Sequence, residues 1–332
     1  MNLDDWFKKR RFKASSYSDI DRLIEYKKEK EETIAVVIPT LNEEDRVGNV
    51  VREVREKLMD EKKLVDELVV MDSGSSDNTR EVAEEAGADF YESSEVLKRR
   101  NGEKGKGENL WKSLYVTESS IITYLDADIK NIHPRFVYGL VGPLLTHENL
   151  KFIKSFFDRP TSCNEEGDDV LGGGRVTELL VRPLLNMYFP SLVGFIQPLS
   201  GQVAGRRDLF EQLNYFTGYG VDIGLLIDTY KKYDLESIAQ VDLGDLEHRH
   251  HDLPHLSKMS FGVLQVFAER AHVLGKVIMS EDVRKRYHVV NKKEKKTSVD
   301  YELKKKYVTE KERDPMITVK DYRNKFHKNG LE

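Results

Sequence analysis

Short apolar runs rich in β-branched residues alternate along the first half of the chain with longer segments whose apolar residues recur at helical spacing. The runs lie at 33–38, 67–71, 88–91 and 121–125, and each is typical of a strand buried in a parallel sheet. Val47, Val50, Val51, Val54 and Leu58 predict a helix within 43–63, and helices are also expected over 77–86 and 107–117. Because strand and helix alternate with short connections, we predict an α/β protein with a doubly wound parallel sheet.

The two ends of the chain and its second half follow other patterns. Residues 1–32 are polar and charged, which predicts a solvated helical arm. The alternation stops after residue 157; the second half mixes glycine-rich turns with a helical stretch at 221–233. From residue 291 onward lysine and glutamate dominate, which is typical of a charged, solvated extension or of a dimer arm. We expect a homodimer.

Composition excludes some classes of partner. The chain has 53 basic and 58 acidic residues and a net charge of -5, which argues against a nucleic-acid partner. The single cysteine, Cys163, cannot form an internal disulfide. No signal-type apolar stretch opens the sequence, and the longest apolar region, at 176–204, is interrupted by Arg182, Pro183 and Pro190. We therefore expect a cytoplasmic protein with no membrane partner.

Four polar clusters stand where ligands bind in open α/β sheets, at the carboxyl ends of the predicted strands or just before a helix. They are 39–44, 72–77, 102–107 and 126–128. Any one of them is equally explained by turn and helix-cap chemistry. Four on one sheet edge favour a binding site. Asp126 and Asp128 can reach a divalent cation, and the glycines around Lys106 predict a loop whose backbone N–H groups approach a phosphate.

Longer motifs around these clusters resemble a known family. Four motifs resemble those of the A-type glycosyltransferase fold, which has a metal site of Asp-x-Asp type: VVIPTLNEE, VVMDSGSSDNT, GKGENLWKSL and YLDADIKNIHP. Four others resemble those of glucosyl-3-phosphoglycerate synthases: GGGRVTELLVRPLL, QPLSGQ, GYGVDIGLLID and AQVDLGDLEHRH. The likeness runs from about residue 33 to residue 256.

The resemblance implies a retaining glycosyltransferase that moves glucose from UDP- or GDP-glucose to 3-phosphoglycerate with Mg²⁺ or Mn²⁺. It implies a Rossmann-like, parallel-centred sheet, with nucleotide-sugar binding in 33–157 and acceptor binding in 158–290. The residues implied for the donor are Pro39, Leu41, Asn42, Glu43, Ser73, Lys106 and Tyr219. Those implied for the acceptor are Gly174, Arg175 and Thr177; for the metal, Asp128 and His248; and for catalysis, Asp126, Asp128 and Asp222.

Two positions depart from the family pattern, and three alternatives stay open. Asp222 stands where glutamate is usual, and Gln202 stands where an acid is usual, so mannose is an alternative to glucose as the transferred sugar. A sugar nucleotidyltransferase is a second alternative, although Pro39-Thr40-Leu41-Asn42 lacks the glycine- and arginine-rich loop that such an enzyme carries. A sugar-nucleotide sensor without catalytic activity is a third.

Overall fold

One mostly parallel sheet forms the centre of the molecule. A computed structural model describes residues 1–100, 102–158, 174–247, 252–295 and 298–327. Its main sheet has eight strands in the order β1-β9-β6-β7-β5-β2-β3-β4, and only β7 runs antiparallel to its neighbours. The α/β prediction is confirmed. The strands are β1 (Arg11–Lys13), β9 (Ile238–Asp245), β6 (Phe152–Asp158), β7 (Val203–Arg206), β5 (Ile121–Tyr124), β2 (Ile34–Thr40), β3 (Glu67–Asp72) and β4 (Asp89–Glu92).

Helices cover both faces of this sheet. Ile34, Val36 and Ile38 of β2 pack into one apolar core, and Val37 between them packs into the other, because successive side chains of a strand point to opposite faces. Helices α2 (Ile20–Glu29), α3 (Val47–Val54), α4 (Thr79–Glu85) and α6 (Arg135–Thr146) line the first core. The second is lined by α1 (Leu3–Lys9), α5 (Lys106–Val116), α7 (Arg182–Tyr188), α8 (Arg207–Phe210), α9 (Val221–Tyr233), α10 (Leu253–Val273) and α11 (Lys320–Phe326).

The N-terminal segment is part of the fold, and the prediction of a solvated arm is wrong for it. The Trp6 side chain is fully buried, and its Nε1 donates a hydrogen bond to the Ile238 carbonyl at 2.8 Å. Strand β1 joins the edge of the main sheet, where Arg11 pairs with Gln240 of β9. The high charge of residues 1–32 led to the wrong prediction, because a single buried tryptophan contributes more apolar area than its share of the sequence suggests.

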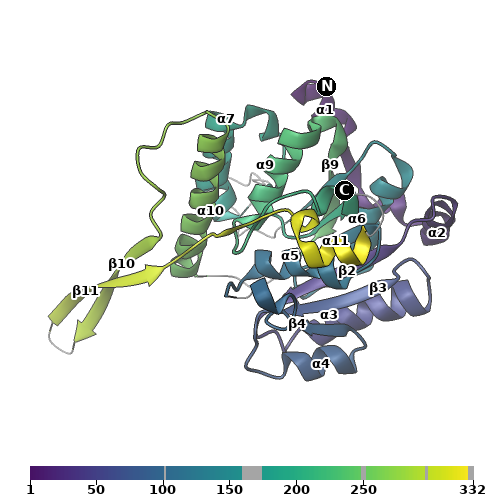
Figure 1. Cartoon of the computed structure of the whole chain (residues 1–332), viewed down its shortest axis with the longest axis horizontal. Coiled ribbons are helices and arrows are strands. Elements are labelled where there is room, and N and C mark those ends of the chain that lie inside the picture. The colour runs from purple at the N-terminus through teal and green to yellow at the C-terminus, as the bar shows by residue number, and fades with distance from the viewer. Residues whose placement is uncertain (101, 159–173, 248–251, 296–297, 328–332) are drawn as a thin grey trace, which may run out of the picture.

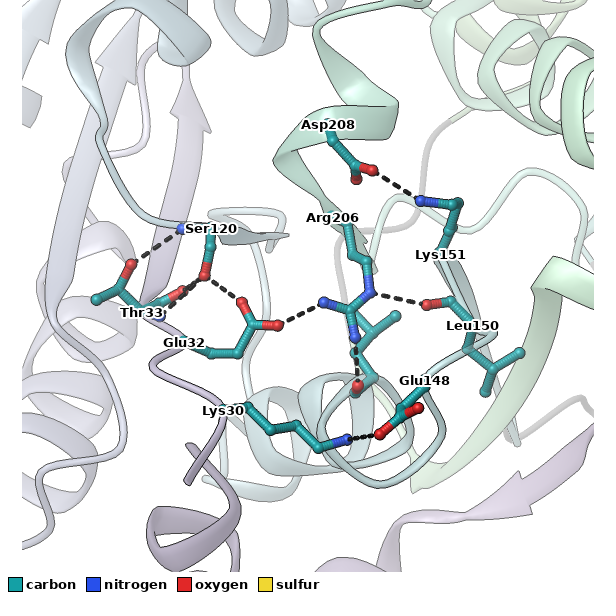
Figure 2. A network of polar contacts seen from close by, with 10 residues as sticks. Lys30, Glu32, Thr33, Ser120, Glu148, Leu150, Lys151, Arg206 and Asp208 are labelled. Carbon is teal, nitrogen blue, oxygen red and sulfur yellow. Dashed lines mark hydrogen bonds and ion pairs between the residues drawn. The ribbon is translucent and has the colours of Figure 1, made fainter. Parts of the chain in front are cut away.

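A polar network ties the end of this segment to the sheet (Figure 2). Glu32 accepts hydrogen bonds from Arg206 at 2.5 Å and from the Ser120 hydroxyl. Arg206 also donates to the Leu150 carbonyl at 3.0 Å. Glu32 lies two residues before β2 and Ser120 directly precedes β5, so the network lies at the amino ends of these strands. It stabilises the edge of the sheet opposite the predicted site.

The C-terminal segment has two parts with different structures. Strands β10 (Arg286–Lys295) and β11 (Ser298–Tyr307) form a hairpin that projects from the body (Figure 1). The chain then returns: β12 (Glu312–Arg313) pairs with β8 (Tyr215–Phe216), and Met316 and Tyr322 are fully buried. The predicted solvated extension is therefore wrong for 308–326. In the parts of the chain that the structure describes, no helix has the length and apolar character needed to cross a membrane.

Candidate active site

Three charged side chains meet at the carboxyl edge of the sheet. Lys106, the first residue of α5, places its Nζ 2.9 Å from Oδ1 of Asp126 and 3.1 Å from Oδ2 of Asp222. Asp126 follows β5, and Asp222 lies in the first turn of α9. Three residues that the sequence singled out separately, from segments as far apart as 106 and 222, thus form one cluster.

Burial and charge act against each other within this cluster. Burial alone would lower the pKa of Lys106, but Asp126 and Asp222 outweigh it, and the pKa of the ammonium lies above its ordinary value. Burial raises the pKa of Asp222, and Lys106 offsets part of that rise. Lys106 therefore stays protonated at neutral pH and holds the two carboxylates side by side.

The QPLSGQ segment fits around Asp126, a role that its sequence did not reveal. Gln202 donates from Nε2 to Oδ2 of Asp126 at 2.8 Å. A Cβ atom on Gly201 would lie 2.3 Å from Nζ of Lys106 and 2.4 Å from Oδ2 of Asp126, so a larger residue would displace these two side chains. The departure at position 202 now has a physical reading, because the neutral amide can donate to Asp126, which an ionised acid cannot do.

Lys154 is a site residue that the sequence analysis missed. It lies in β6 with no exposed surface, and its Nζ donates to the carbonyls of Ser200 at 2.9 Å and Asp222 at 3.1 Å. Burial lowers its pKa to about 8 despite the nearby Asp222. The only signal in the sequence was a lysine inside an apolar strand, which is rare unless the lysine is paired.

The glycines beside Lys106 have a packing role that the sequence analysis did not predict. Gly105 has a φ of +128°, and a Cβ there would lie 2.6 Å from the Thr217 carbonyl oxygen. A Cβ on Gly107 would lie 1.7 Å from the carbonyl oxygen of Phe216. Both glycines allow the start of α5 to pack against the 216–217 backbone. This packing positions Lys106. That the glycines also let backbone N–H groups approach a phosphate stays a prediction.

The predicted donor residues form two adjoining loops after β2 and β3. The backbone N–H of Asn42, whose φ is +55°, donates to the Ser75 hydroxyl at 2.7 Å, and its Oδ1 accepts from the Ser76 backbone N–H at 2.9 Å. Leu41 is 54% exposed, so its side chain is available to a ligand. Three further predicted residues lie beside them, namely Pro39 paired with Met71, Ser73 donating from its backbone to Thr40, and Glu43 donating from its backbone to Thr79.

Asp72 organises these loops; the sequence analysis named it only as part of the 72–77 cluster and assigned it no role. One carboxylate oxygen accepts backbone N–H groups from Gly74 and Ser75, each at 2.7 Å. The other accepts the hydroxyls of Thr40 at 2.9 Å and Ser75 at 2.6 Å. Asp72 thus holds the two loops in register. Ser73 also lines a small pocket of about 110 Å³ with residues 92–94 and 102–104.

Tyr219 faces both the donor loops and the charged cluster. Its side chain is 46% exposed, and its ring meets that of His255 edge-on at 6.1 Å between centroids. Partial burial raises the pKa of its phenol, Lys106 opposes that rise, and the carboxylates of Asp126, Asp128 and Glu43 add to it. The charges that act on this phenol come from three chain segments, which carry Glu43, Lys106, and Asp126 with Asp128.

The segment beside the second predicted metal ligand lies close to Asp128. Lys130 donates its backbone N–H to the Glu247 carbonyl at 2.8 Å, and Glu247 donates in turn to Oδ1 of Asn131 at 2.9 Å. His248 itself lies outside the described residues. Within the described ranges, no group of three or more histidine, cysteine, aspartate or glutamate side chains could hold a metal.

The predicted acceptor residues lie at the start of a short irregular helix. Gly174 accepts the backbone N–H of Glu178 at 3.2 Å, Arg175 is exposed, and Thr177 is buried at the first position of 177–181. Arg182 fixes this helix by donating to Glu178 and to the carbonyls of 193, 195 and 196. Gly172, Gly173 and Cys163 lie outside the described residues.

A mostly parallel sheet with an Asp-x-Asp segment and polar loops at its carboxyl edge is the arrangement of the A-type glycosyltransferases. Residues 35–165 match the family model "Glycosyl transferase family 2". The chain is 42% identical over 327 residues to glucosyl-3-phosphoglycerate synthase of Petrotoga mobilis, covering 98% of this chain and 99% of that one. The chain belongs to the glucosyl-3-phosphoglycerate synthase family, as the resemblance predicted.

Two solved structures agree with this assignment. Glucosyl-3-phosphoglycerate synthase from Mycobacterium tuberculosis, in complex with Mn²⁺, UDP and glucosyl-3-phosphoglycerate, has a TM-score of 0.76 and 38% identity over 90% of this chain and 94% of that chain. Mannosyl-3-phosphoglycerate synthase from Rubrobacter xylanophilus has a TM-score of 0.86 and 32% identity over 95% of this chain and 99% of that chain. The same fold thus serves two sugars.

Proposed function

We propose that this enzyme transfers glucose from UDP-glucose to 3-phosphoglycerate with retention of the anomeric configuration and with Mg²⁺ or Mn²⁺. The observation that carries the proposal is the Lys106–Asp126–Asp222 cluster beside the 39–43 and 72–77 loops. The family assignment supports the substrates, because relatives with this name have been solved with UDP-glucose and phosphoglyceric acid and with Mn²⁺ or Mg²⁺. A nucleotidyltransferase would not share this family.

The two loops hold the nucleoside in this proposal. Pro39, Leu41, Asn42, Glu43 and Ser73 border the same surface, and Leu41 offers an exposed apolar side chain to the base. Lys106, Tyr219 and Asp222 lie further along the edge, beside the donor sugar and its diphosphate. The protonated Lys106 limits the negative charge of the carboxylates that the diphosphate meets there.

Asp128 and His248 would hold the metal, and the diphosphate would complete its ligands. When bound, the ion stabilises the negative charge that develops on the leaving diphosphate. A carboxylate, an imidazole and phosphate oxygens suit Mg²⁺ or Mn²⁺, and the nitrogen ligand favours Mn²⁺. The hydrogen bonds between Lys130, Asn131 and Glu247 keep the segment before His248 close to Asp128.

The chemistry is a same-face substitution at the anomeric carbon. The bond from this carbon to the diphosphate oxygen breaks, a bond to the acceptor hydroxyl oxygen forms, and the hydroxyl proton passes to the leaving diphosphate. A covalent route would need a free carboxylate nucleophile behind the anomeric carbon. Asp126 and Asp222 are both engaged by Lys106, which argues against that role for either. Positioning and electrostatics then supply most of the acceleration.

The assembly and location of the enzyme follow from weaker observations. We propose a homodimer, because the β10–β11 hairpin projects from the body and exposes apolar side chains, with Val290 67% and Leu303 60% exposed. The two residues are register partners and so share one face of the hairpin. A cytoplasmic location stays a prediction from the sequence.

A transfer assay with a panel of nucleotide sugars tests the activity. UDP-glucose and 3-phosphoglycerate should give glucosyl-3-phosphoglycerate, identified by mass and NMR, and the product should disappear in excess chelator and return with Mg²⁺ or Mn²⁺. GDP-mannose belongs in the panel because of the likeness to a mannosyl synthase. Preferred turnover of GDP-mannose would mean that the transferred sugar is mannose. Full activity in excess chelator would refute the requirement for a metal ion. Absence of turnover with every donor and metal would favour the sensor.

The acceptor site is tested at Arg175. If 174–177 grips 3-phosphoglycerate, Arg175→Ala removes a charge-assisted contact, which contributes roughly 1.5–3 kcal/mol. The KM for 3-phosphoglycerate should therefore rise about tenfold or more, while calorimetric binding of UDP-glucose without acceptor stays unchanged. Arg175→Lys should recover only part of the loss, because an ammonium keeps the charge but not the fork. Weakened donor binding with an unchanged acceptor KM would contradict this placement.

A further inference from the structure

Glu310 is a buried acid on the segment that returns from the hairpin. It is 4% exposed, and its Oε2 accepts the backbone N–H of Gly218 at 2.9 Å across 92 residues of sequence. Burial raises its pKa to about 7, and the backbone N–H groups of Gly218, Gly220 and Tyr219 act in the opposite direction by stabilising the ionised form. A carboxylate here costs folding free energy, so its presence needs an explanation.

Three glycines leave the space that the carboxylate fills. A Cβ atom on Gly218 would lie 2.4 Å from Oε1 of Glu310, and one on Gly262 of α10 would lie 2.6 Å from the same oxygen. A Cβ on Gly220 would lie 3.3 Å from the Cδ atom of Glu310. The Gly-Tyr-Gly turn and helix α10 are thus shaped around this one side chain.

Hydrogen bonds on both sides keep Glu310 in this position. Thr217 and Lys311 exchange two bonds: the Thr217 backbone N–H donates to the Lys311 carbonyl at 2.9 Å, and the Lys311 backbone N–H donates to the Thr217 hydroxyl at 3.2 Å. On the other side, Gln265 of α10 donates to the Val308 carbonyl at 2.9 Å and accepts from the Glu310 backbone at 3.4 Å. The segment is therefore bound to both elements that flank the turn.

We propose that Glu310 is a positioning residue for the donor sugar, acting through the Gly218–Gly220 turn. The carboxylate accepts hydrogen bonds from the backbone N–H groups of this turn and so fixes the positions of two features. One is Tyr219; the other is the start of α9, which follows Gly220 directly and carries Asp222. The inference rests on the proposed function, in which Tyr219 and Asp222 lie beside the donor sugar.

The protonation state of Glu310 makes this role dependent on pH. A protonated carboxyl group loses acceptor capacity, so its hold on the turn weakens as pH falls through about 7. Among the surrounding charges, Asp222 acts on Glu310 and raises its pKa. Lys311 pairs with Glu103 and Arg313 with Glu108, while Gly262 and Gln265 of α10 carry no charge. The wild-type KM for UDP-glucose should therefore rise toward acid pH.

Steady-state kinetics of Glu310→Gln, in the full-length enzyme, test the proposal. Glutamine keeps the size of the side chain but puts an NH₂ group where an oxygen accepted backbone N–H groups. We expect the KM for UDP-glucose to rise about tenfold at pH 8, on the scale of a lost charge-assisted hydrogen bond. The KM for 3-phosphoglycerate should change less than about twofold. Between pH 6 and pH 8 the donor KM of the variant should be flat, where that of the wild type varies.

Asp314→Asn is the matched control, because Asp314 lies four residues along the same segment and is exposed. It should behave as wild type. An unchanged KM for UDP-glucose and an unchanged pH profile in Glu310→Gln would overturn the proposal. An equal rise in the KM values for UDP-glucose and 3-phosphoglycerate, together with a lowered melting temperature, would also overturn it. Tyr219→Ala separates the two hypotheses. If it leaves the donor KM unchanged, the placement of the sugar fails; if it raises that KM and Glu310→Gln does not, only the role of Glu310 fails.

Discussion

Lys154 shows how single buried charges are balanced in this active site. Its side chain has no exposed surface. The ammonium donates hydrogen bonds to the backbone carbonyls of Ser200 and Asp222, which are neutral acceptors. Lys106 lies nearby and adds to the lowering of its pKa that burial causes. A charge in such a place is retained at a cost to stability.

This cost predicts a pH dependence of stability. The pKa of Lys154 falls from 10.5 to about 8 on folding, so the unfolded chain binds more protons between these values. The free energy of unfolding should therefore gain a contribution of roughly 3 kcal/mol as pH rises through this window. Urea denaturation of wild type and Lys154→Met from pH 7.5 to pH 10.5 measures it. The wild type should gain stability relative to the variant, and parallel pH profiles would contradict the prediction.

At the scale of elements, the first helix and strand decide how the sheet ends. Strand β1 adds a parallel edge next to β9, and α1 before it contributes Trp6 to the second core. Only the indole N–H needs a partner there, and the Ile238 carbonyl provides one. The N-terminal segment of the chain therefore closes the sheet at the edge beside β9.

The packing of Trp6 predicts a large loss when it is truncated. Trp6→Ala should reduce the free energy of unfolding by about 3–5 kcal/mol, because it removes a fully buried aromatic side chain and leaves a cavity. Urea denaturation followed by circular dichroism gives the value. Lys9→Ala, on the same helix with 70% of its side chain exposed, is the control and should cost less than about 0.5 kcal/mol. A loss below about 1 kcal/mol for Trp6→Ala would mean that α1 behaves as a solvated arm.

At the scale of the whole molecule, the β10–β11 hairpin stands out because it projects from the body. It projects beyond α10, and Val290, Tyr301, Leu303 and Tyr307 are each at least 60% exposed along it (Figure 1). Tyr301, Leu303 and Tyr307 are separated by even numbers of residues, and Leu303 is paired with Val290, so the four share one face. An exposed apolar face of this kind is typical of an interface.

The proposed dimer is tested on this face. Val290→Asp combined with Leu303→Asp should convert the dimer to a monomer, because two carboxylates would then have to be buried in the interface without partners. Light scattering coupled to gel filtration measures the mass of each species. Lys304→Ser, on the opposite face of β11, is the control and should stay dimeric. A wild type that is already monomeric, or a double variant that remains a dimer, would refute the proposed interface.

The sequence by itself determined the alternation of strands and helices, the edge of the sheet at which Lys106, Asp126 and Asp222 meet, and the family. These features are local: β-branched runs form strands, and polar residues at strand ends mark the binding edge. Predicted bounds agree within a few residues, as for the helix at 221–233, which is α9. Asp126, Lys106 and Asp222 were all identified before their contacts were known.

Only the tertiary structure decided which distant residues meet. Lys154 and Glu310 become part of the site through β6 and the returning C-terminal segment, and no local pattern announces that. The packing role of the glycines beside Lys106 was missed for the same reason, because the backbone they accommodate, at 216–217, lies more than a hundred residues away. The burial of Trp6 and the packing of the chain after residue 307 were not predicted, because both segments are rich in charged residues. Composition averages over a segment, whereas packing depends on the few side chains that reach a core assembled from the whole chain.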